Sequence, residues 1–540
     1  SLGGSYYARE SRDFSSWRSM FSWNNNRQST QHTYRVFGKL VQKFGSAEDN
    51  EDESSATIKN AFFTIQGNYT NNKYTYVDAD HQDDLFNYGY VGQFVTSKAP
   101  VYNFRSTVTD SSSGILYTGR VLNGWTDTLF EYTPGGVNTA LENYTNAYID
   151  MFSEYSLPSY IGGYGADGQL RTAIDLQGKG LLNGELPSNV YSLFGNHGSM
   201  YNGSAKQENT QTTFKASGSA DIKSHEFSFG FEFEQRKDYY WGSSPMNLWG
   251  LMRQQANKHI LEIDDSNPNP VFDENGIYQD TVNYDRLFIG SEQSTFDANF
   301  REKHNLGQLD FIDIDSYSPD AFNLDMLSQD ELLNSGSSLV YYYGYDIYGN
   351  KNEANNTLKD FFTHKDDNGQ YTRNIAAYNP IYQAGYIQDK FAVEDLIFNI
   401  GLRVDRFDAN QKVLKDKYLL YSAYTAGADV DLLNSTSAPS TIGDDYVVYV
   451  DDIDNPSAVV GYRNGDIWYN SDGLVISDPT LLAQAAGGKI APYLINPDDA
   501  KNGDVKMDAF EDYTPETVFM PRIAFSFPIS DEAQFFAHYD

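Results

Sequence analysis

Aromatic and polar residues alternate strictly over the segment 227–236. Phe227, Phe229, Phe231 and Phe233 are separated by small or charged residues. Successive side chains of a β-strand point to opposite faces, so this pattern predicts a strand with one aromatic and one polar face. The segment 213–222 alternates in the same way, and a short polar joint at 223–225 connects the two. The sequence therefore predicts a hairpin of two strands, each about 10 residues long.

Strands of this length cross a bilayer at a tilt, with the apolar face toward lipid and the polar face toward a wet interior. Half-buried strands of a soluble sheet also alternate, so the hairpin alone leaves both interpretations open. In a barrel, the four phenylalanines are predicted to face lipid. Charges on the polar faces are expected to pair across strands, contact a plug or line the substrate path. The predicted lumen-facing residues are Lys215, Glu232, Glu234, Arg236, Arg403, Asp405 and Arg522.

Further strands are predicted by the same alternation, at 31–44, 61–70, from 88, at 396–405 and at 522–527. Two more are predicted at 295–304 and 309–315, on either side of a turn at 305–308. Apolar residues at helical spacing predict short helices over 137–155 and from 244 to about 260.

The predicted connections alternate between short and long. Short turns are expected at 223–225, 305–308, 392–395 and 530–532, and long loops at about 238–291, 316–379 and 408–516. Loops this long are uncommon in compact soluble domains, but they occur on the extracellular side of outer-membrane barrels. We therefore predict an all-β fold: a transmembrane antiparallel β-barrel over 1–540, with long extracellular loops that contain short helices.

Composition narrows the classes of protein. The formal net charge is −35, which argues against nucleic acid as a partner because phosphates would be repelled. Aromatic residues make up 15% of the chain, whereas disordered acidic chains are poor in them. The absence of cysteine excludes disulfides and thiolate metal sites. Both ends of the sequence have the pattern of a strand interior, so we expect an interior piece of a longer precursor.

Motifs for catalysis are absent from the sequence. It contains no zinc-binding His-Glu-x-x-His, no phosphate-binding loop and no nucleophile elbow, so we predict no enzyme activity, no metal and no cofactor. The segments 273–276 and 366–369 resemble the first half of a calcium loop but lack the twelfth-position glutamate. Acidic turns are the first interpretation of these segments, and a weak surface calcium site is the alternative.

Two blocks of sequence carry a family resemblance. Residues 386–390 (Tyr-Ile-Gln-Asp-Lys) precede 396–405, which ends in Gly-Leu-Arg-Val-Asp, and 521–531 precede an aromatic strand at 535–539. This arrangement resembles the hairpins of TonB-dependent outer-membrane receptors, and the style of the loops resembles those of Bacteroidetes. The resemblance implies a barrel of about 22 strands with a plugged lumen. The chain is then a partial barrel that lacks the plug and the final strands.

The resemblance also implies a function, namely energised uptake of a scarce or large ligand such as a glycan, a peptide or a metal chelate. The implied partners are outer-membrane lipid, the TonB complex acting through the plug, and in some receptors a surface lipoprotein. The implied location is the outer membrane of a Gram-negative bacterium. A passive porin and a surface-displayed all-β adhesin are the alternatives.

Recognition is expected in the loops. Tyrosine-rich segments at 341–345 and 445–449 offer aromatic faces with hydroxyl groups. The longest predicted loop, 408–516, carries the ligand-binding candidates Tyr446, Tyr449, Asp451 and Asp452.

Overall fold

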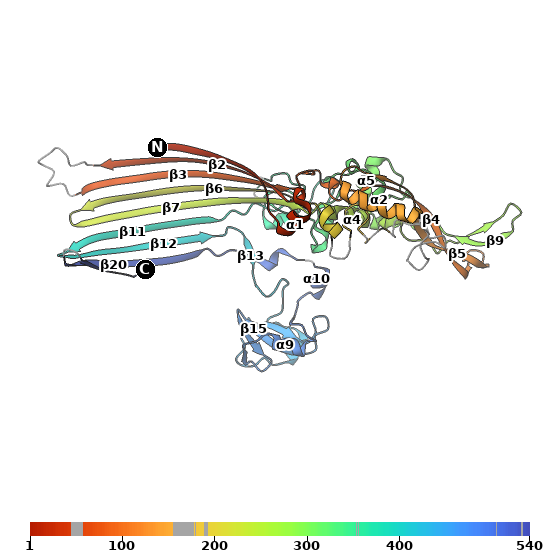
Figure 1. Ribbon diagram of the computed structural model, residues 1–540. Coiled ribbons are helices and arrows are strands. Elements are labelled where there is room, and N and C mark those ends of the chain that lie inside the picture. Colours follow the sequence, from red (N-terminus) through yellow and green to blue (C-terminus); the bar gives the residue numbers. More distant parts are fainter. Residues whose placement is uncertain are drawn as a thin grey trace.

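A long sheet dominates the computed structural model, with a body of helices and hairpins at one end and a small blue module attached by a narrow stalk (Figure 1). The structure describes residues 1–44, 58–154, 176, 178, 180–187, 193–352, 354, 356–503, 505–530 and 533–539. Among these residues, no helix is long and apolar enough to span a membrane.

The long sheet is an antiparallel meander in which neighbouring strands follow one another in chain order. Its path begins at β1 and ends at β21, and these two strands are not paired with each other in the described part of the chain, so the sheet is open. A short strand, β10 (Val340–Tyr343), joins the end of β7. The nine strands of the path are β1 (Leu2–Arg12), β2 (Gln28–Phe44), β3 (Ile58–Val77), β6 (Ser204–Ile222), β7 (His225–Ser243), β11 (Ile381–Val393), β12 (Leu396–Asp408), β20 (Glu516–Ser530) and β21 (Ala533–Tyr539).

Short and long connections lie at opposite ends of this sheet (Figure 1). The predicted turns at 223–225 and 392–395 are confirmed, and each has a left-handed residue, Lys223 (φ 59°) and Glu394 (φ 54°). The predicted turn at 530–532 falls partly on 531–532, outside the described residues. The long connections 78–203, 244–380 and 409–515 all leave from the other end.

The prediction of strands at 295–304 and 309–315 is wrong. Residues Thr295–His304 form a helix, α5, and no strand follows it over 309–315. Ser294 caps the helix by accepting a hydrogen bond from the N–H of Asp297, and Phe296 and Phe300 lie one turn apart in the core. The turn at 305–308 is therefore not a hairpin. The predicted loops 238–291 and 316–379 belong to one connection between β7 and β11.

The first two long connections, 78–203 and 244–380, fold together into one body, which we call the loop body. Asn183 donates to Asp315 Oδ1 (2.9 Å) and accepts from the N–H of Val91 (2.7 Å), while Arg253 pairs with Asp315 (2.8 Å). The predicted helices are present as α2 (Thr139–Glu154) and α4 (Met246–Gln255), although α4 ends before residue 260. The other elements of this body are β4 (Gly92–Thr109), β5 (Leu116–Pro134), α3 (Leu193–Gly198), β8 (Asn269–Phe272), β9 (Tyr278–Asn283), α6 (Gln329–Leu333) and α7 (Leu358–Thr363). The helix α1 (Ser16–Ser22) belongs to the shorter connection between β1 and β2.

The third connection, predicted as a loop over 408–516, is largely a folded module. A two-stranded stalk, β13 (Lys412–Leu414) with β19 (Phe510–Asp512), carries a five-stranded sheet. Val448, Val450 and Tyr462 form the centre of its core. The remaining elements are α8 (Asp431–Ser435), β14 (Val447–Val450), β15 (Val459–Asn464), β16 (Ile467–Asn470), β17 (Val475–Ile476), α9 (Thr480–Ala485), β18 (Ala491–Pro492) and α10 (Pro497–Asn502).

A buried ion pair holds α5 in the loop body. Asp297 is fully buried and accepts from Arg301 Nε at 2.7 Å, while Arg301 also donates to the carbonyl oxygens of Gly307 and Asp310. Burial disfavours the ionised form of Asp297, but hydrogen bonds from Arg301, from the N–H of Asn257 and from Gln293 outweigh it and lower the pKa of Asp297. The carboxylate therefore stabilises the fold at neutral pH.

Replacing Arg301 with Met should destabilise the loop body by about 3–5 kcal/mol, because Asp297 would be left buried without its cation. Urea unfolding followed by Trp fluorescence measures the loss. Glu302→Gln, an exposed position on the same helix, is the control and should change stability by less than about 0.5 kcal/mol. In the wild type, the contribution of Asp297 should disappear only as pH falls from the ordinary carboxyl range through its lowered pKa. Equal stability of the two variants would contradict this role for Arg301.

Candidate functional site

The strand register separates the long sheet into two chemically different faces. Directly paired residues of antiparallel strands share a face. Phe229 is paired with Gly218 of β6 and with Ile387 of β11, and Phe231 with Ala216 and Gly385. The four predicted phenylalanines share one face, and Phe229 and Phe231 are 54% and 46% exposed. This face is thus apolar and uncovered at its centre.

The apolar face continues across the neighbouring strands. From Phe231 the register leads through Ala216 and Ile65 to Leu40 in one direction, and through Gly385 and Val404 to Phe519 in the other. The large exposed apolar side chains on this face include Tyr34, Val36, Leu40, Ile65, Tyr69, Phe214, Phe229, Phe231, Ile387, Ile400, Leu402, Phe519, Ile523 and Phe525. Such a continuous surface far exceeds what a soluble monomer normally exposes.

Aromatic rings form a row across this face near the short turns. Phe391, Phe398, Phe525 and Phe535 belong to four successive strands, and neighbouring ring centroids are 5.4, 6.5 and 5.9 Å apart. His225 continues the row onto β7, at 5.1 Å from Phe391. Aromatic girdles at this position flank the apolar band of outer-membrane barrels.

The opposite face holds all seven residues predicted to face a lumen. Lys215 pairs with Glu232 across β6 and β7 (2.6 Å), and Arg403 pairs with Asp405 (2.7 Å). Tyr382 joins the second pair by donating to Asp405 Oδ2 and accepting from Arg403. Glu234 lies 3.8 Å from Arg236, and Arg522 is paired in register with Gly401, which shares the face of Arg403. The charges therefore neutralise one another along one wall.

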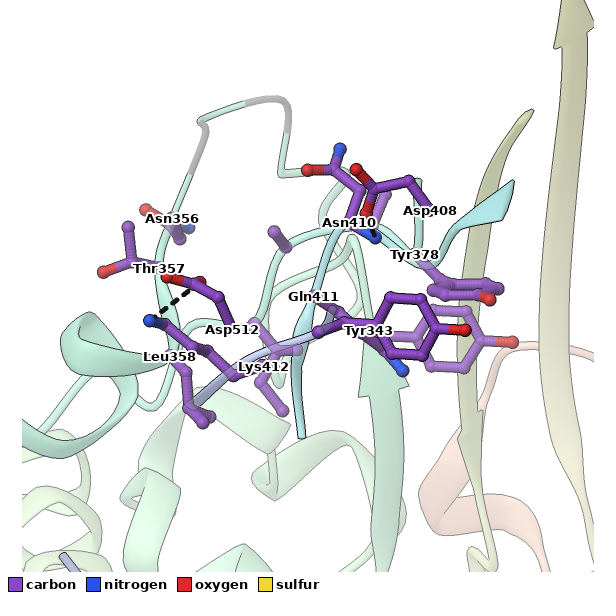
Figure 2. A pocket seen from close by; sticks show the side chains of 14 residues that line it. Tyr343, Asn356, Thr357, Leu358, Tyr378, Asp408, Asn410, Gln411, Lys412 and Asp512 are labelled. Carbon is purple, nitrogen blue, oxygen red and sulfur yellow. Dashed lines mark hydrogen bonds and ion pairs between the residues drawn. The ribbon is translucent and has the colours of Figure 1, made fainter. Parts of the chain in front are cut away.

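A cavity of about 820 Å³ lies where two long connections meet the sheet (Figure 2). Its lining includes three tyrosines, Tyr343, Tyr378 and Tyr513, and the ion pair between Lys412 and Asp512 (2.8 Å). Figure 2 shows the rings of Tyr343 and Tyr378 side by side, on the side of the cavity away from the Lys412–Asp512 pair.

Polar groups on the cavity wall are available for a ligand. The Asn356 side-chain nitrogen is buried and has no hydrogen-bond partner among the described residues. Tyr343 stacks on Tyr240 with ring centroids 5.9 Å apart, and burial raises its pKa, so its hydroxyl stays protonated near neutral pH. Aromatic faces beside amides and a charge pair suit a polar organic ligand. The cavity is our candidate binding site.

The four ligand-binding candidates of the module have structural roles. Tyr449 is 2% exposed and its hydroxyl accepts from Arg463 Nε at 2.9 Å, so its ring cannot touch a ligand. Tyr446 packs against Tyr469 at 5.3 Å. Asp451 accepts from Ser457 and from the N–H of Ala458, which lowers the pKa of its carboxyl group. Asp452 accepts from the N–H groups of residues 454 and 455.

The acidic segments predicted as turns or weak calcium sites form the same turn. Asp273 Oδ1 accepts from the N–H groups of residues 275 and 277, and Asp366 Oδ1 accepts from those of 368 and 370. Gly276 and Gly369 follow with positive φ of 78° and 79°. Asn470 and Gly473 repeat the arrangement with an amide oxygen as the acceptor, so the turn forms without a carboxylate at its first position. Among the described residues, no group of three or more candidate ligands could hold a metal ion.

Sequence reasoning missed most of the cavity. Tyr343 lies in the tyrosine-rich segment that was expected to offer aromatic faces, but Tyr378, Lys412 and Asp512 carry no local signal. They come together only because the end of the connection between β7 and β11 lies beside the two ends of the connection between β12 and β20. Comparison of the chain with protein-family models, curated proteins and solved structures finds no match.

Replacing Tyr449 with Phe should destabilise the module by about 1–3 kcal/mol, because a buried guanidinium N–H of Arg463 would lose its acceptor. Hydrogen exchange over 447–470 measures the effect. Tyr418→Phe is the matched control: its ring also lies against the Arg463 guanidinium (4.9 Å), but its hydroxyl donates to the exposed Asp466, so the change should have little effect. The same protection in both variants would argue against a core role for the Tyr449 hydroxyl.

Proposed function

We propose that the chain is the barrel portion of a TonB-dependent outer-membrane receptor, which takes up a scarce or large ligand with energy supplied through the TonB complex. The observation that carries this proposal is the shape of the apolar band on the long sheet. The sequence resemblance at 386–405 and 521–539 adds the family, and the ion-paired opposite face fits a wet interior.

The apolar band crosses the hydrogen-bonded rows at a slant. Toward the long connections, the last apolar residue of the band on β2 is Tyr34. The register aligns Tyr34 with Lys237 of β7. On β7 the band ends earlier, at Phe233, and Phe233 is aligned with Arg406 of β12. On β12 the band ends earlier again, at Val404. The edge of the band thus moves in one direction along the strands, by about one residue for each strand crossed.

This slant measures how the strands would lie in a membrane. One residue is about 3.3 Å along a strand, and neighbouring strands are about 4.8 Å apart, so the strands are tilted by about 35° from the normal of the band. Transmembrane barrels have strand tilts of about 35–45°. The band on β12, from Leu396 to Val404, then has a height of about 22 Å, near the roughly 25 Å expected of a lipid-facing band.

The connections support an orientation. Short turns at 223–224 and 394–395 fit the periplasmic side, and the large folded connections fit the extracellular side, where a ligand arrives. A surface-displayed adhesin would have no reason to keep an apolar band slanted across its strands. A passive porin would share the band, but its loops are usually shorter; the resemblance favours energised uptake, with a plug as the element on which TonB acts.

Phe229→Arg and Phe231→Arg should each destabilise the assembled barrel by about 2–4 kcal/mol, because a guanidinium would lie near the middle of the membrane. Ser228→Arg is the matched control, since Ser228 lies between Phe227 and Phe229 on the polar face of the same strand. Heat-modifiable gel mobility in outer-membrane fractions measures assembly. Normal assembly of both Phe variants, or an equal defect in Ser228→Arg, would count against the lipid-facing assignment.

Epitope tags should report the orientation in intact cells. A tag between Ser471 and Asp472, two exposed residues in a turn of the module, should be labelled from outside. A tag between Lys223 and Ser224 should be labelled only after the outer membrane is permeabilised. Labelling of both tags in intact cells would exclude the proposed topology.

A further inference from the structure

The cavity of Figure 2 lies where the ladder between β11 and β12 opens. The ladder pairs Ile381 with Asp408. Two residues further along each segment, Asn379 and Asn410 are still joined by a hydrogen bond from the Asn410 side chain to the Asn379 carbonyl oxygen (3.1 Å). The next pair in the same register would be Ala377 with Lys412. These two residues both line the cavity instead of pairing.

The backbone of Asn410 explains why the ladder opens. Its φ is 49°, in the left-handed region that interrupts a strand, and its N–H donates to Asp408 Oδ1 at 2.8 Å. Beyond this point the chain leaves β11 and pairs with β19 instead. A gap is left between two extended segments that a regular sheet would have joined.

Backbone groups on one wall of this gap point into it. The N–H and C=O of Tyr378 both bond to Asp238 of β7, and the C=O of Pro380 accepts from Arg236 of the same strand. Alternate residues of a strand direct their backbone groups to opposite sides, so those of Ala377 and Asn379 point away from β7. The Ala377 N–H and C=O have no hydrogen-bond partner among the described residues.

The other wall shows the same alternation. The C=O of Gln411 accepts from the N–H of Tyr513, and the N–H of Lys415 donates to the C=O of Ala509. Residues 411, 413 and 415 therefore face β19, and the backbone groups of Lys412 and Leu414 point to the outer edge of β13. No third strand pairs with β13 in the described part of the chain. The unpaired backbone groups of Ala377 and the outer edge of β13 thus border one cavity. The open stretch at Ala377 is one residue long, because the C=O of Ile375 accepts from the N–H of Gly344 and the C=O of Asn379 accepts from the Asn410 side chain.

We infer that this cavity binds an extended peptide, whose backbone pairs with Ala377 on one side and with Lys412 of β13 on the other. Only a backbone with alternating N–H and C=O groups complements two such edges at once, and strand addition gives affinity largely independent of peptide sequence. The three tyrosines and the Asn356 amide line the same cavity, where side chains of a bound peptide could contact them. A volume of about 820 Å³ lies within the range of ligand sites. The inference rests on the proposed function, and it names the class of ligand that the receptor would take up.

The test uses the detergent-purified protein and a fluorescent library of eight-residue peptides with randomised sequences. Lys412→Pro removes the N–H that points into the gap, together with the ammonium group that pairs with Asp512, and proline is tolerated where a strand edge is unpaired. It should weaken peptide binding by about tenfold or more, through the lost hydrogen bond and the bulk of the ring. Lys412→Ala removes the same ion pair to Asp512 but keeps the N–H, so the difference between the two Lys412 variants measures the backbone hydrogen bond. Lys412→Ala should bind peptide at least about threefold more tightly than Lys412→Pro.

Peptides methylated on alternate backbone nitrogens provide a second measurement, which needs no protein variant and should show the same loss. Absence of peptide binding, or binding insensitive to both Lys412→Pro and N-methylation, would overturn the inference. Binding of maltohexaose in place of peptides would also overturn it. Heat-modifiable mobility of the same preparation tests the proposed function separately. A protein that assembles as a barrel but binds no peptide would refute only the inference.

Discussion

The register of the antiparallel ladder is the constraint on which the rest of this structure depends. A shift by one residue between any two strands would send every side chain of one strand to the opposite face. Because the register holds across nine strands, Phe231 and Val404 share a face although they are far apart in the sequence. The same register brings Lys215 and Glu232 together on the other face. One geometric rule therefore separates an apolar surface from a charge-neutralised wall.

The same rule limits where a binding cavity can form. Within the ladder, the interior strands are paired on both sides, and the two faces carry apolar side chains and ion pairs respectively. Where the ladder ends, the pairing pattern continues for one more step and then fails, as it does after Asn379 and Asn410. The groups left over are backbone donors and acceptors with a fixed direction. A site built from them can recognise an extended chain without the sequence-specific side chains that a catalytic site requires.

Much of the sheet could be predicted from the sequence because period-two alternation is a local signal. The strands around Phe229 and Leu402, and the turns at 223–225 and 392–395, lie where the pattern predicted them. The segment 295–304 was mistaken for a strand because Phe296 and Phe300 are compatible with both a period of two and a helical period. The cap at Ser294 and the buried ion pair between Asp297 and Arg301 stabilise the helix. The burial of that pair depends on the rest of the body, so the sequence pattern alone does not reveal it. The cavity could not be predicted, since the approach of Ala377 to Lys412 depends on where two ladders end.

The long connections show how an acidic chain can still build stable loops. Carboxylates such as Asp273 and Asp366 accept the N–H groups of their own turns, so part of the negative charge is used locally to fix backbone. Others are buried against arginines: Asp315 pairs with Arg253, 62 residues away, and Asp297 pairs with Arg301 of its own helix while it accepts from the N–H of Asn257. Buried pairs of this kind are costly to break, and hydrophobic contacts beside them supply the net stability. These pairs therefore fix parts of the connection between β7 and β11, which is the connection that also supplies Ala377 to the wall of the cavity.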